Sequence, residues 1–239
     1  MTIRFEGEIA LVSGGTGELG RAVALALLRE GADVMVTYVI REEFDALQRD
    51  AGTHGSRLVG HAVDVTDETA VARLVEAIVA KHGRLDVLVN AVGGYAGGTP
   101  VWESEGRVLD RMLALNLRSG FALSRAVVPD MIRRRRGVIV NIAAKAALEH
   151  PAGAAAYAAS KAAALALLDS LAEELKATGV RVNSVLPSII DTPANRKAMP
   201  DADFSRWPKP EEIARVILFL CSDDARVIHG AAIPVYGDS

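Results

Sequence analysis

Residues 13–20, SGGTGELG, follow the apolar run EIALV at 8–12 and lead into the helical pattern of residues 18–31. Glycines between a buried strand and a helix permit a tight turn, in which the backbone approaches a diphosphate and the helix N-terminus attracts its charge. A turn that only reverses the chain would contain the same residues. The position of this turn, after the first strand of a strand–helix–strand unit, favours dinucleotide binding.

Apolar runs alternate with helical patterns along the whole chain, with no linker or internal repeat. Strands are expected near residues 8–15, 32–39, 57–65, 85–94, 137–144, 180–188 and 230–238. Helices are expected near residues 18–31, 41–52, 67–83, 105–134, 153–179 and 210–225, and a loop or lid at 191–210. Continuously apolar strands are typical of a parallel sheet that helices cover on both faces. The pattern therefore predicts one doubly wound α/β domain over residues 1–239.

The composition limits the expected partners and compartment. With 27 basic and 30 acidic residues the net charge is −3, so no nucleic-acid partner is expected, and the basic run 133–136 is interpreted as a solvated helix end. The single cysteine, Cys221, excludes an internal disulfide, and the five scattered histidines lack metal-ligand spacing, so no metal site is expected. No signal peptide and no membrane-spanning segment are expected, which favours a cytoplasmic protein.

The residues after the second and third strands bear on the choice of cofactor. A carboxylate at the end of the second strand usually binds the ribose of NAD, but Tyr38 and Val39 occupy that place here and Arg41 follows. Arg41 could pair with the 2′-phosphate of NADP, or be a solvated residue at a helix start. On this basis the sequence favours NADP over NAD. Asp64 could bind the adenine amino group, cap the following helix, or do both.

Tyr157 and Lys161, in the stretch YAASK, lie one helical turn apart and share a face of the predicted helix. A free tyrosine has a pKa of about 10, and a nearby ammonium group lowers that pKa and so favours acid–base chemistry near neutral pH. Most pairs of this kind are ordinary neighbours. The other motifs of the chain therefore decide how the pair is interpreted.

Five further stretches accompany the pair in order along the chain. They are SGGTGELG, DVT at 64–66, LVNAVGG at 88–94, LNLRSGF at 115–121 and RVNSVLPSIIDTP at 181–193. Together with Tyr-x-x-x-Lys they resemble the short-chain dehydrogenase/reductase family over residues 5–238. The resemblance implies a single Rossmann domain with a seven-stranded sheet, bound NAD or NADP, a small-molecule substrate, and a homotetramer or homodimer.

The resemblance also implies roles for individual residues. Tyr157 is the expected acid–base and Lys161 its partner, while Asn116 is expected to hold a helix bend and a proton-relay water. Asn90 is expected to face the cofactor, and residues 187–192 to position the nicotinamide carboxamide. The expected cofactor contacts are Gly14, Thr16, Gly17, Leu19, Gly20, Tyr38, Arg41, Asp64, Val65, Asn90, Ala91, Tyr157, Lys161, Pro187, Ile190 and Thr192.

Three positions depart from the family pattern. Glu18 stands where a glycine is usual, so its charge opposes a phosphate unless the side chain points to solvent. Ala91 follows Asn90 where a second polar residue is usual. The family's serine, which hydrogen-bonds the substrate carbonyl, falls on Ala144. Losing one such donor typically costs ~10²–10³ in rate.

Other donors stand close to Ala144 in the sequence. Lys145 and Ser188 could reach the site, although each is interpreted more simply as solvated or helix-capping. Ser160 lies between the tyrosine and the lysine but off their shared face. A different substrate, such as a pteridine reduced across conjugated C=N bonds, could also remove the need for the serine.

The sequence therefore predicts an NAD(P)-dependent oxidoreductase that transfers hydride between nicotinamide and a small carbonyl or alcohol, similar to 3-oxoacyl reductases or pteridine reductases. The alternative is a cofactor-binding sensor or scaffold with little catalysis, which Ala144 and Glu18 favour and the retained catalytic motif disfavours. The helical patterns that contain Asn116 and Tyr157 are apolar on more than one face, so we expect them to pack against a second subunit.

Overall fold

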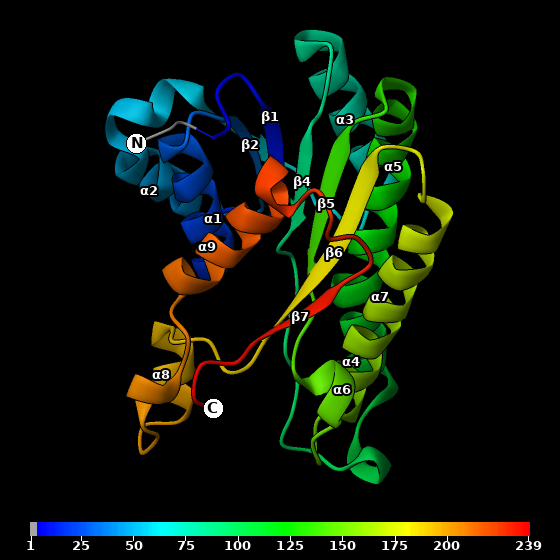
Figure 1. Ribbon diagram of the computed structural model, residues 1–239. Coiled ribbons are helices and arrows are strands. Elements are labelled where there is room, and N and C mark those ends of the chain that lie inside the picture. The colour runs from blue at the N-terminus through cyan, green and yellow to red at the C-terminus, as the bar shows by residue number, and fades with distance from the viewer. Residues whose placement is uncertain (1–3) are drawn as a thin grey trace.

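A computed structural model describes residues 4–239, and Figure 1 shows one parallel sheet between two layers of helices. The sheet has seven strands in the order β3-β2-β1-β4-β5-β6-β7. The strands are β1 (Ile9–Ser13), β2 (Asp33–Tyr38), β3 (Leu58–Ala62), β4 (Val87–Asn90), β5 (Gly137–Ile142), β6 (Val180–Pro187) and β7 (Ala232–Val235). Every neighbouring pair is parallel, which confirms the predicted doubly wound Rossmann fold.

Helices cover both faces of the sheet. On one face lie α1 (Glu18–Arg29), α2 (Arg41–Ala51) and α9 (Pro210–Cys221), and on the other α3 (Glu68–His82), α5 (Ser119–Arg134) and α7 (Ala155–Glu174). The remaining helices are α4 (Gly106–Leu113), α6 (Ala146–Glu149) and α8 (Pro193–Ala198). Side chains of a strand alternate between the two faces. Val12 therefore joins the core under α1, whereas Leu11 joins the core under α3 and α5.

Several segments differ from their predicted form. The helix expected at 105–134 is divided by a π-helical turn, Ala114–Arg118, because the Asn116 side chain bonds outside the helix. The third strand ends at Ala62 rather than at residue 65. The segment 191–210, expected as a loop, contains α8, which Thr192 caps through the Asn195 N–H, as well as a short 3₁₀ turn. Across residues 4–239, none of the helices combines the length and the apolar content that a membrane crossing requires.

The order of the strands positions the site. β1 and β4 are neighbours in the sheet, but the chain leaves β1 toward α1 on one face and leaves β4 toward α4 and α5 on the other. A crevice therefore opens beyond the carboxyl ends of these two strands. Gly14 lies at this point, where a side chain would meet Val92 at 3.0 Å. The glycine turn and the connection after β4 thus form the two sides of the crevice.

The interpretation of residues 133–136 as a solvated helix end is wrong for Arg134. Its guanidinium binds Asp86 at 3.0 Å and Asp130 at 2.8 Å, and its side chain is only 20% exposed. The Asp86 carboxylate is buried and also accepts from the Ile9 N–H and from Arg84. A buried carboxylate needs such partners to offset its lost hydration. Arg134 therefore ties α5 to the amino-terminal end of β4, at the opposite end of the strands from the crevice.

Gly20→Ala should destabilise the protein by about 1–3 kcal/mol, because the new Cβ would lie 2.1 Å from the Gly14 carbonyl oxygen. Alanine is otherwise the better helix former by about 1 kcal/mol, so propensity predicts the opposite sign. Gly106→Ala is the matched control, since nothing lies within 4 Å of the position of its Cβ. Thermal unfolding of both variants measures the difference. Equal melting temperatures would contradict the tight turn.

Candidate active site

The glycine turn has the geometry of a diphosphate cradle. Gly14 adopts a positive φ of 65°, which favours glycine, and its N–H donates to the Thr37 hydroxyl at 3.0 Å. Gly20, on the first turn of α1, lies against the Gly14 carbonyl with no room for a side chain. Glu18 is the first residue of α1 and is exposed, so its side chain is not packed within the turn. The residues present therefore fit a diphosphate at the start of α1.

The segment after β2 contacts the glycine turn through the carboxylate of Glu43. The Thr16 hydroxyl donates to Glu43 at 2.8 Å, which links the turn to the first turn of α2. Arg41 donates to Asp45 at 2.8 Å on the exposed surface of α2. The Tyr38 ring stacks on Phe44, with 4.9 Å between the ring centroids. Glu43 was not identified from the sequence, although it lies in the EE pair that directly follows Arg41.

Asp64 and its neighbours lie beyond the end of β3. The Asp64 carboxylate is exposed and accepts from the N–H and hydroxyl of Thr66, both through Oδ1. Asp67, not Asp64, caps α3, through the N–H groups of Thr69 and Ala70. Val65 is buried in the core. Of the two roles left open for Asp64, the capping role is therefore wrong, and the adenine contact stays a prediction.

Asn90 belongs to a buried polar row across three strands. Its amide accepts from the Ser13 hydroxyl at 2.7 Å and donates to Asn141 at 3.2 Å. The next residue, Ala91, continues the pairing with its N–H to the Ser13 carbonyl. Within residues 4–239, the Asn141 amide nitrogen is the one buried side-chain nitrogen or oxygen that has no hydrogen-bond partner. The Asn90 side chain thus fastens β4 to its neighbours, and a contact with the cofactor stays a prediction.

Tyr157 and Lys161 lie on the first turns of α7, as predicted. The Lys161 side chain is buried, and its ammonium donates to the Ile142 carbonyl at 2.7 Å. Burial lowers the pKa of Lys161 to about 8. Burial, together with the nearby Tyr95, raises the pKa of Tyr157 to about 12. The expected lowering of the tyrosine pKa is therefore wrong, because the loss of hydration on burial dominates.

Asn116 links the connection after β4 to the first turns of α7. Its side-chain oxygen accepts from the Gly94 N–H at 2.9 Å, and its amide nitrogen donates to the Gly94 carbonyl at 3.0 Å. The same nitrogen donates to the Ser160 hydroxyl at 2.9 Å, which donates in turn to the Tyr157 carbonyl at 2.7 Å. Ser160 is thus a buried link between Asn116 and the backbone of Tyr157. The bend expected at Asn116 is present as the π-helical turn.

The two donors considered near Ala144 are already engaged. Lys145 donates to the Ser239 carbonyl at 3.2 Å, and the Ser188 hydroxyl donates to the Tyr236 carbonyl at 2.7 Å. Ala144 itself is buried. These contacts tie the segment after β5 and the end of β6 to the chain beyond β7. Neither side chain therefore replaces the donor that Ala144 lacks in this conformation.

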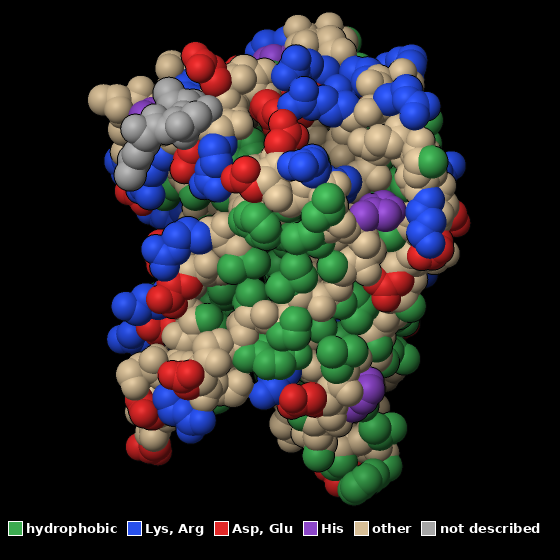
Figure 2. Space-filling view, viewed as in Figure 1, with side chains coloured by type: hydrophobic (Ala, Val, Ile, Leu, Met, Phe, Trp, Pro, Cys, Tyr) green, Lys and Arg blue, Asp and Glu red, His purple; other side chains and the backbone are tan. Residues whose placement is uncertain are grey.

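The segment after β6 forms one wall of the crevice. The Pro187 carbonyl accepts from the Lys145 N–H at 2.8 Å, and the Ile190 carbonyl accepts from the Asn195 amide at 2.8 Å. The Thr192 hydroxyl oxygen accepts from the Asn195 N–H at 3.2 Å and so caps α8. In Figure 2 the molecule is hollowed between the region of α8 and that of α6, where the strands end. The nicotinamide contacts expected here stay predictions.

Tyr95 is a site residue that the sequence analysis missed. Its ring meets the Tyr157 ring edge to face, with centroids 5.0 Å apart and the planes at 72°. It is 70% exposed, in the connection that follows β4. The available signal was an aromatic residue set among glycines immediately after a strand that ends at the crevice.

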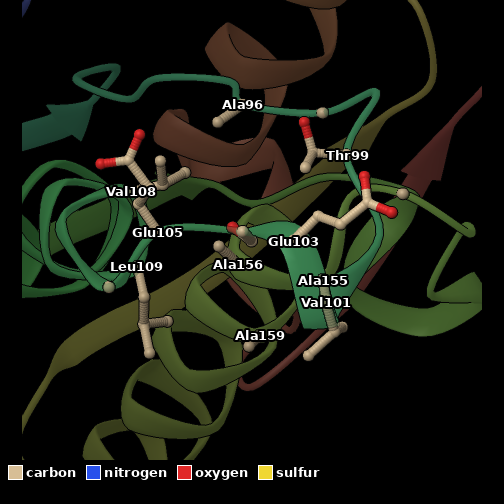
Figure 3. A pocket seen from close by; sticks show the side chains of 14 residues that line it. Ala96, Thr99, Val101, Glu103, Glu105, Val108, Leu109, Ala155, Ala156 and Ala159 are labelled. Atoms are coloured by element: carbon tan, nitrogen blue, oxygen red, sulfur yellow. The ribbon is translucent and has the colours of Figure 1, made fainter.

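A cavity of about 570 Å³ lies beside the site (Figure 3). Its lining includes Ala155, Ala156 and Ala159 of α7. At 3.6 residues per turn these alanines lie on the side of α7 away from the row formed by Tyr157 and Lys161. The cavity therefore belongs to the outer surface of α4 and α7 rather than to the reacting groups.

Lys161→Met should change stability in a pH-dependent way. Below pH 8 the lysine is charged in both the folded and the unfolded chain, so the folded state carries the full cost of burying the charge. Between pH 8 and 10.5 only the unfolded lysine still binds its proton, so that cost disappears as pH rises. Relative to the variant, the parent should gain up to about 3 kcal/mol between pH 7 and 10. Denaturant unfolding of the parent and the variant at pH 7 and pH 10 measures their free energies of unfolding. A difference between the two proteins that does not change with pH would refute the buried ammonium.

Known proteins match this chain over nearly its whole length. Residues 16–237 match the family model described as enoyl-(acyl carrier protein) reductase. The 3-oxoacyl-[acyl-carrier-protein] reductase of Thermotoga maritima is 34% identical over 98% of each chain. The D-threitol dehydrogenase of Mycolicibacterium smegmatis is also 34% identical, over 98% of this chain and 93% of that protein.

Solved structures agree with these matches. A short-chain type dehydrogenase/reductase from Mycobacterium ulcerans superimposes with a TM-score of 0.93 at 29% identity, over 98% of this chain and 90% of that one. The NAD⁺-bound xylitol dehydrogenase superimposes with a TM-score of 0.90 at 28% identity, over 98% and 99%. The glycine turn, the Tyr-x-x-x-Lys helix and these likenesses together assign the chain to the short-chain dehydrogenase/reductase family, as an NAD(P)-dependent oxidoreductase.

Proposed function

We propose that the protein interconverts a small ketone and its secondary alcohol, with Tyr157 as the acid–base. The nicotinamide supplies or accepts the hydride when it is bound. In reduction, the Tyr157 phenol gives its proton to the carbonyl oxygen, and Lys161 holds the ribose beside it. The observation that carries this proposal is the bonding of Asn116, which fixes the backbone of Tyr157, one helical turn from the buried Lys161, at the crevice.

The raised pKa of Tyr157 supports the reductive direction. With a pKa of about 12, the phenol is protonated at neutral pH and ready to act as a donor. Lys161, with a pKa of about 8, is still mostly charged at pH 7. The lysine can therefore stabilise the phenolate that the proton transfer leaves behind.

The names of the relatives support the class of substrate. The similar proteins include reductases of 3-oxoacyl groups, a D-threitol dehydrogenase and a cyclopentanol dehydrogenase, and each name refers to an oxygen on carbon rather than to a C=N bond. We therefore favour a simple ketone or 3-oxoacyl substrate over a pteridine. The cytoplasmic location and the homotetramer or homodimer stay predictions, and the alanine-lined cavity on α4 and α7 is where we expect a second subunit to pack.

Tyr157→Phe should abolish turnover, by at least about 10³-fold, because the phenylalanine has no proton to give. Cofactor affinity should stay within about twofold, since the ring remains. Fluorescence titration with NADH and NADPH measures binding, and loss of nicotinamide absorbance with ethyl acetoacetate, cyclopentanone, menadione and a quinonoid dihydropterin measures turnover. Full activity in the variant would end the assignment of Tyr157. Binding by the parent without any turnover across the panel would favour the sensor or scaffold instead.

For the cofactor we infer a preference for NAD, which reverses the expectation from Arg41. The 2′ position of the ribose is recognised at the end of β2, where Glu43 reaches the glycine turn through Thr16. Arg41 is already paired with Asp45. A 2′-phosphate would thus meet an acidic helix start, whereas a ribose hydroxyl could donate to Glu43.

Glu43→Gln should therefore tighten NADPH binding by up to about tenfold and leave NADH binding nearly unchanged or weaker, because one like charge is removed from an exposed site. Glu42→Gln is the matched control, with the same charge change one residue earlier on the exposed start of α2. Paired fluorescence titrations give both dissociation constants. If Glu42→Gln tightened NADPH binding as much as Glu43→Gln, net charge and not the position of Glu43 would explain the effect, and the role of Glu43 would be overturned. Tighter binding of NADPH than of NADH by the parent would overturn the preference for NAD.

A further inference from the structure

Tyr95 is an exposed aromatic residue fixed against the proposed acid. It lies between β4 and α4, is 70% exposed, and places its ring edge to face with the Tyr157 ring at 5.0 Å. Edge-to-face pairs of this kind stabilise a defined orientation by about 0.5–1.5 kcal/mol. The contact therefore places the ring of a second phenol against the ring of Tyr157.

The backbones of the two tyrosines are held by the same side chain. Asn116 binds both the N–H and the carbonyl of Gly94, the residue before Tyr95. Through Ser160, Asn116 also binds the carbonyl of Tyr157. Asn116 is itself buried and has both its amide oxygen and its amide nitrogen engaged. One amide thus links the backbone next to Tyr95 with the backbone of Tyr157.

The hydroxyl of Tyr95 occupies space that a glycine leaves open. A Cβ at position 97 would lie 2.1 Å from the Tyr95 hydroxyl oxygen, so any side chain there would displace the phenol. The phenol of Tyr95 is also close enough to contribute to the raised pKa of Tyr157. The hydroxyl of Tyr95 therefore lies beside Gly97, in the same connection that brings its ring against Tyr157.

The reaction needs a donor that the other elements do not supply. Negative charge develops on the carbonyl oxygen during reduction, and removing one preorganised donor typically costs ~10²–10³ in rate. At the end of β5, Ala143 and Ala144 present only methyl groups. Lys145 and Ser188 are bonded to the chain beyond β7. Tyr95 remains as the phenol in contact with Tyr157.

We propose that Tyr95 is a second catalytic residue, whose hydroxyl donates a hydrogen bond to the same substrate oxygen that Tyr157 protonates. The proposal rests on the proposed function. Tyr95 keeps its proton throughout: the hydride goes to the carbonyl carbon, the C=O π bond becomes the new O–H bond, and Tyr157 alone loses a proton. The hydrogen-bond donor is thus supplied by the connection after β4, in place of the serine that the family has after β5.

The decisive variant is Tyr95→Phe, which removes the hydroxyl and keeps the ring. Turnover on the best substrate of the four-compound panel should fall ~10²-fold or more, and the affinity for NADH and the melting temperature should stay unchanged. Gly97→Ala should also lower turnover, because it displaces the hydroxyl without removing it. Gly106→Ala, whose new methyl group meets nothing within 4 Å, is the matched control and should keep full turnover.

A second substitution separates a donor from a packing role. If Tyr95 supplies the missing donor, Ala144→Ser should restore at least about tenfold of the turnover lost in Tyr95→Phe, and should raise the parent's turnover by less. A ring that served only for packing would give no such rescue. The measured quantity is the difference between the effect of Ala144→Ser on Tyr95→Phe and its effect on the parent. This difference does not depend on how active the parent is.

The outcomes distinguish this inference from the function beneath it. Inactive Tyr157→Phe with a fully active Tyr95→Phe would overturn the role of Tyr95 alone. Loss of NADH binding or of folding in Tyr95→Phe, or a drop that Ala144→Ser does not rescue, would make Tyr95 structural and overturn the role as well. Active Tyr157→Phe, or no turnover by the parent on any of the four compounds, would overturn the proposed function and this inference together.

Discussion

The bonding of Asn116 is the interaction on which the catalytic end of the molecule depends. Its amide bonds to the backbone N–H and carbonyl of Gly94 and to the Ser160 hydroxyl, at 2.9–3.0 Å in each case. A side chain that bonds outside its own helix perturbs the regular ladder, and here the chain forms a π-helical turn at that point. The local cost of that turn is offset by the alignment of α7 with the connection after β4. The interaction thus links the backbone next to Tyr95 with that of Tyr157.

The rest of the fold supplies the frame for this interaction. Parallel strands bring all their carboxyl ends to one edge, so the glycine turn after β1, the glycines after β4 and the alanines after β5 meet although they are far apart in sequence. At the opposite edge, Arg134 and Asp86 fasten α5 and the sheet. The Arg134–Asp86 pair thus lies away from the crevice, where the buried Lys161 bears the cost of its own desolvation.

Of the groups proposed for catalysis, the Tyr157 phenol and the Lys161 ammonium have pKa values that burial shifts more than any neighbouring charge does. Burial makes Tyr157 a weaker acid and Lys161 a weaker base than in water. Each shift favours the neutral form of its group. A proton is therefore kept on the phenol until a substrate and a cofactor change the local field, which suits a group that donates only during reduction.

The sequence alone determined the fold, the family resemblance and the positions of the Tyr157–Lys161 pair and Asn116, because hydrophobic periodicity and glycine placement are local properties of the chain. Only the tertiary structure decided the direction of the Tyr157 pKa, the pairing of Arg134, the contact of Glu43 with Thr16 and the place of Tyr95. Each of these depends on burial or on partners that are distant in sequence. A pattern of neighbouring residues contains no information about how much water a folded chain excludes, or about which loops meet at the end of a sheet.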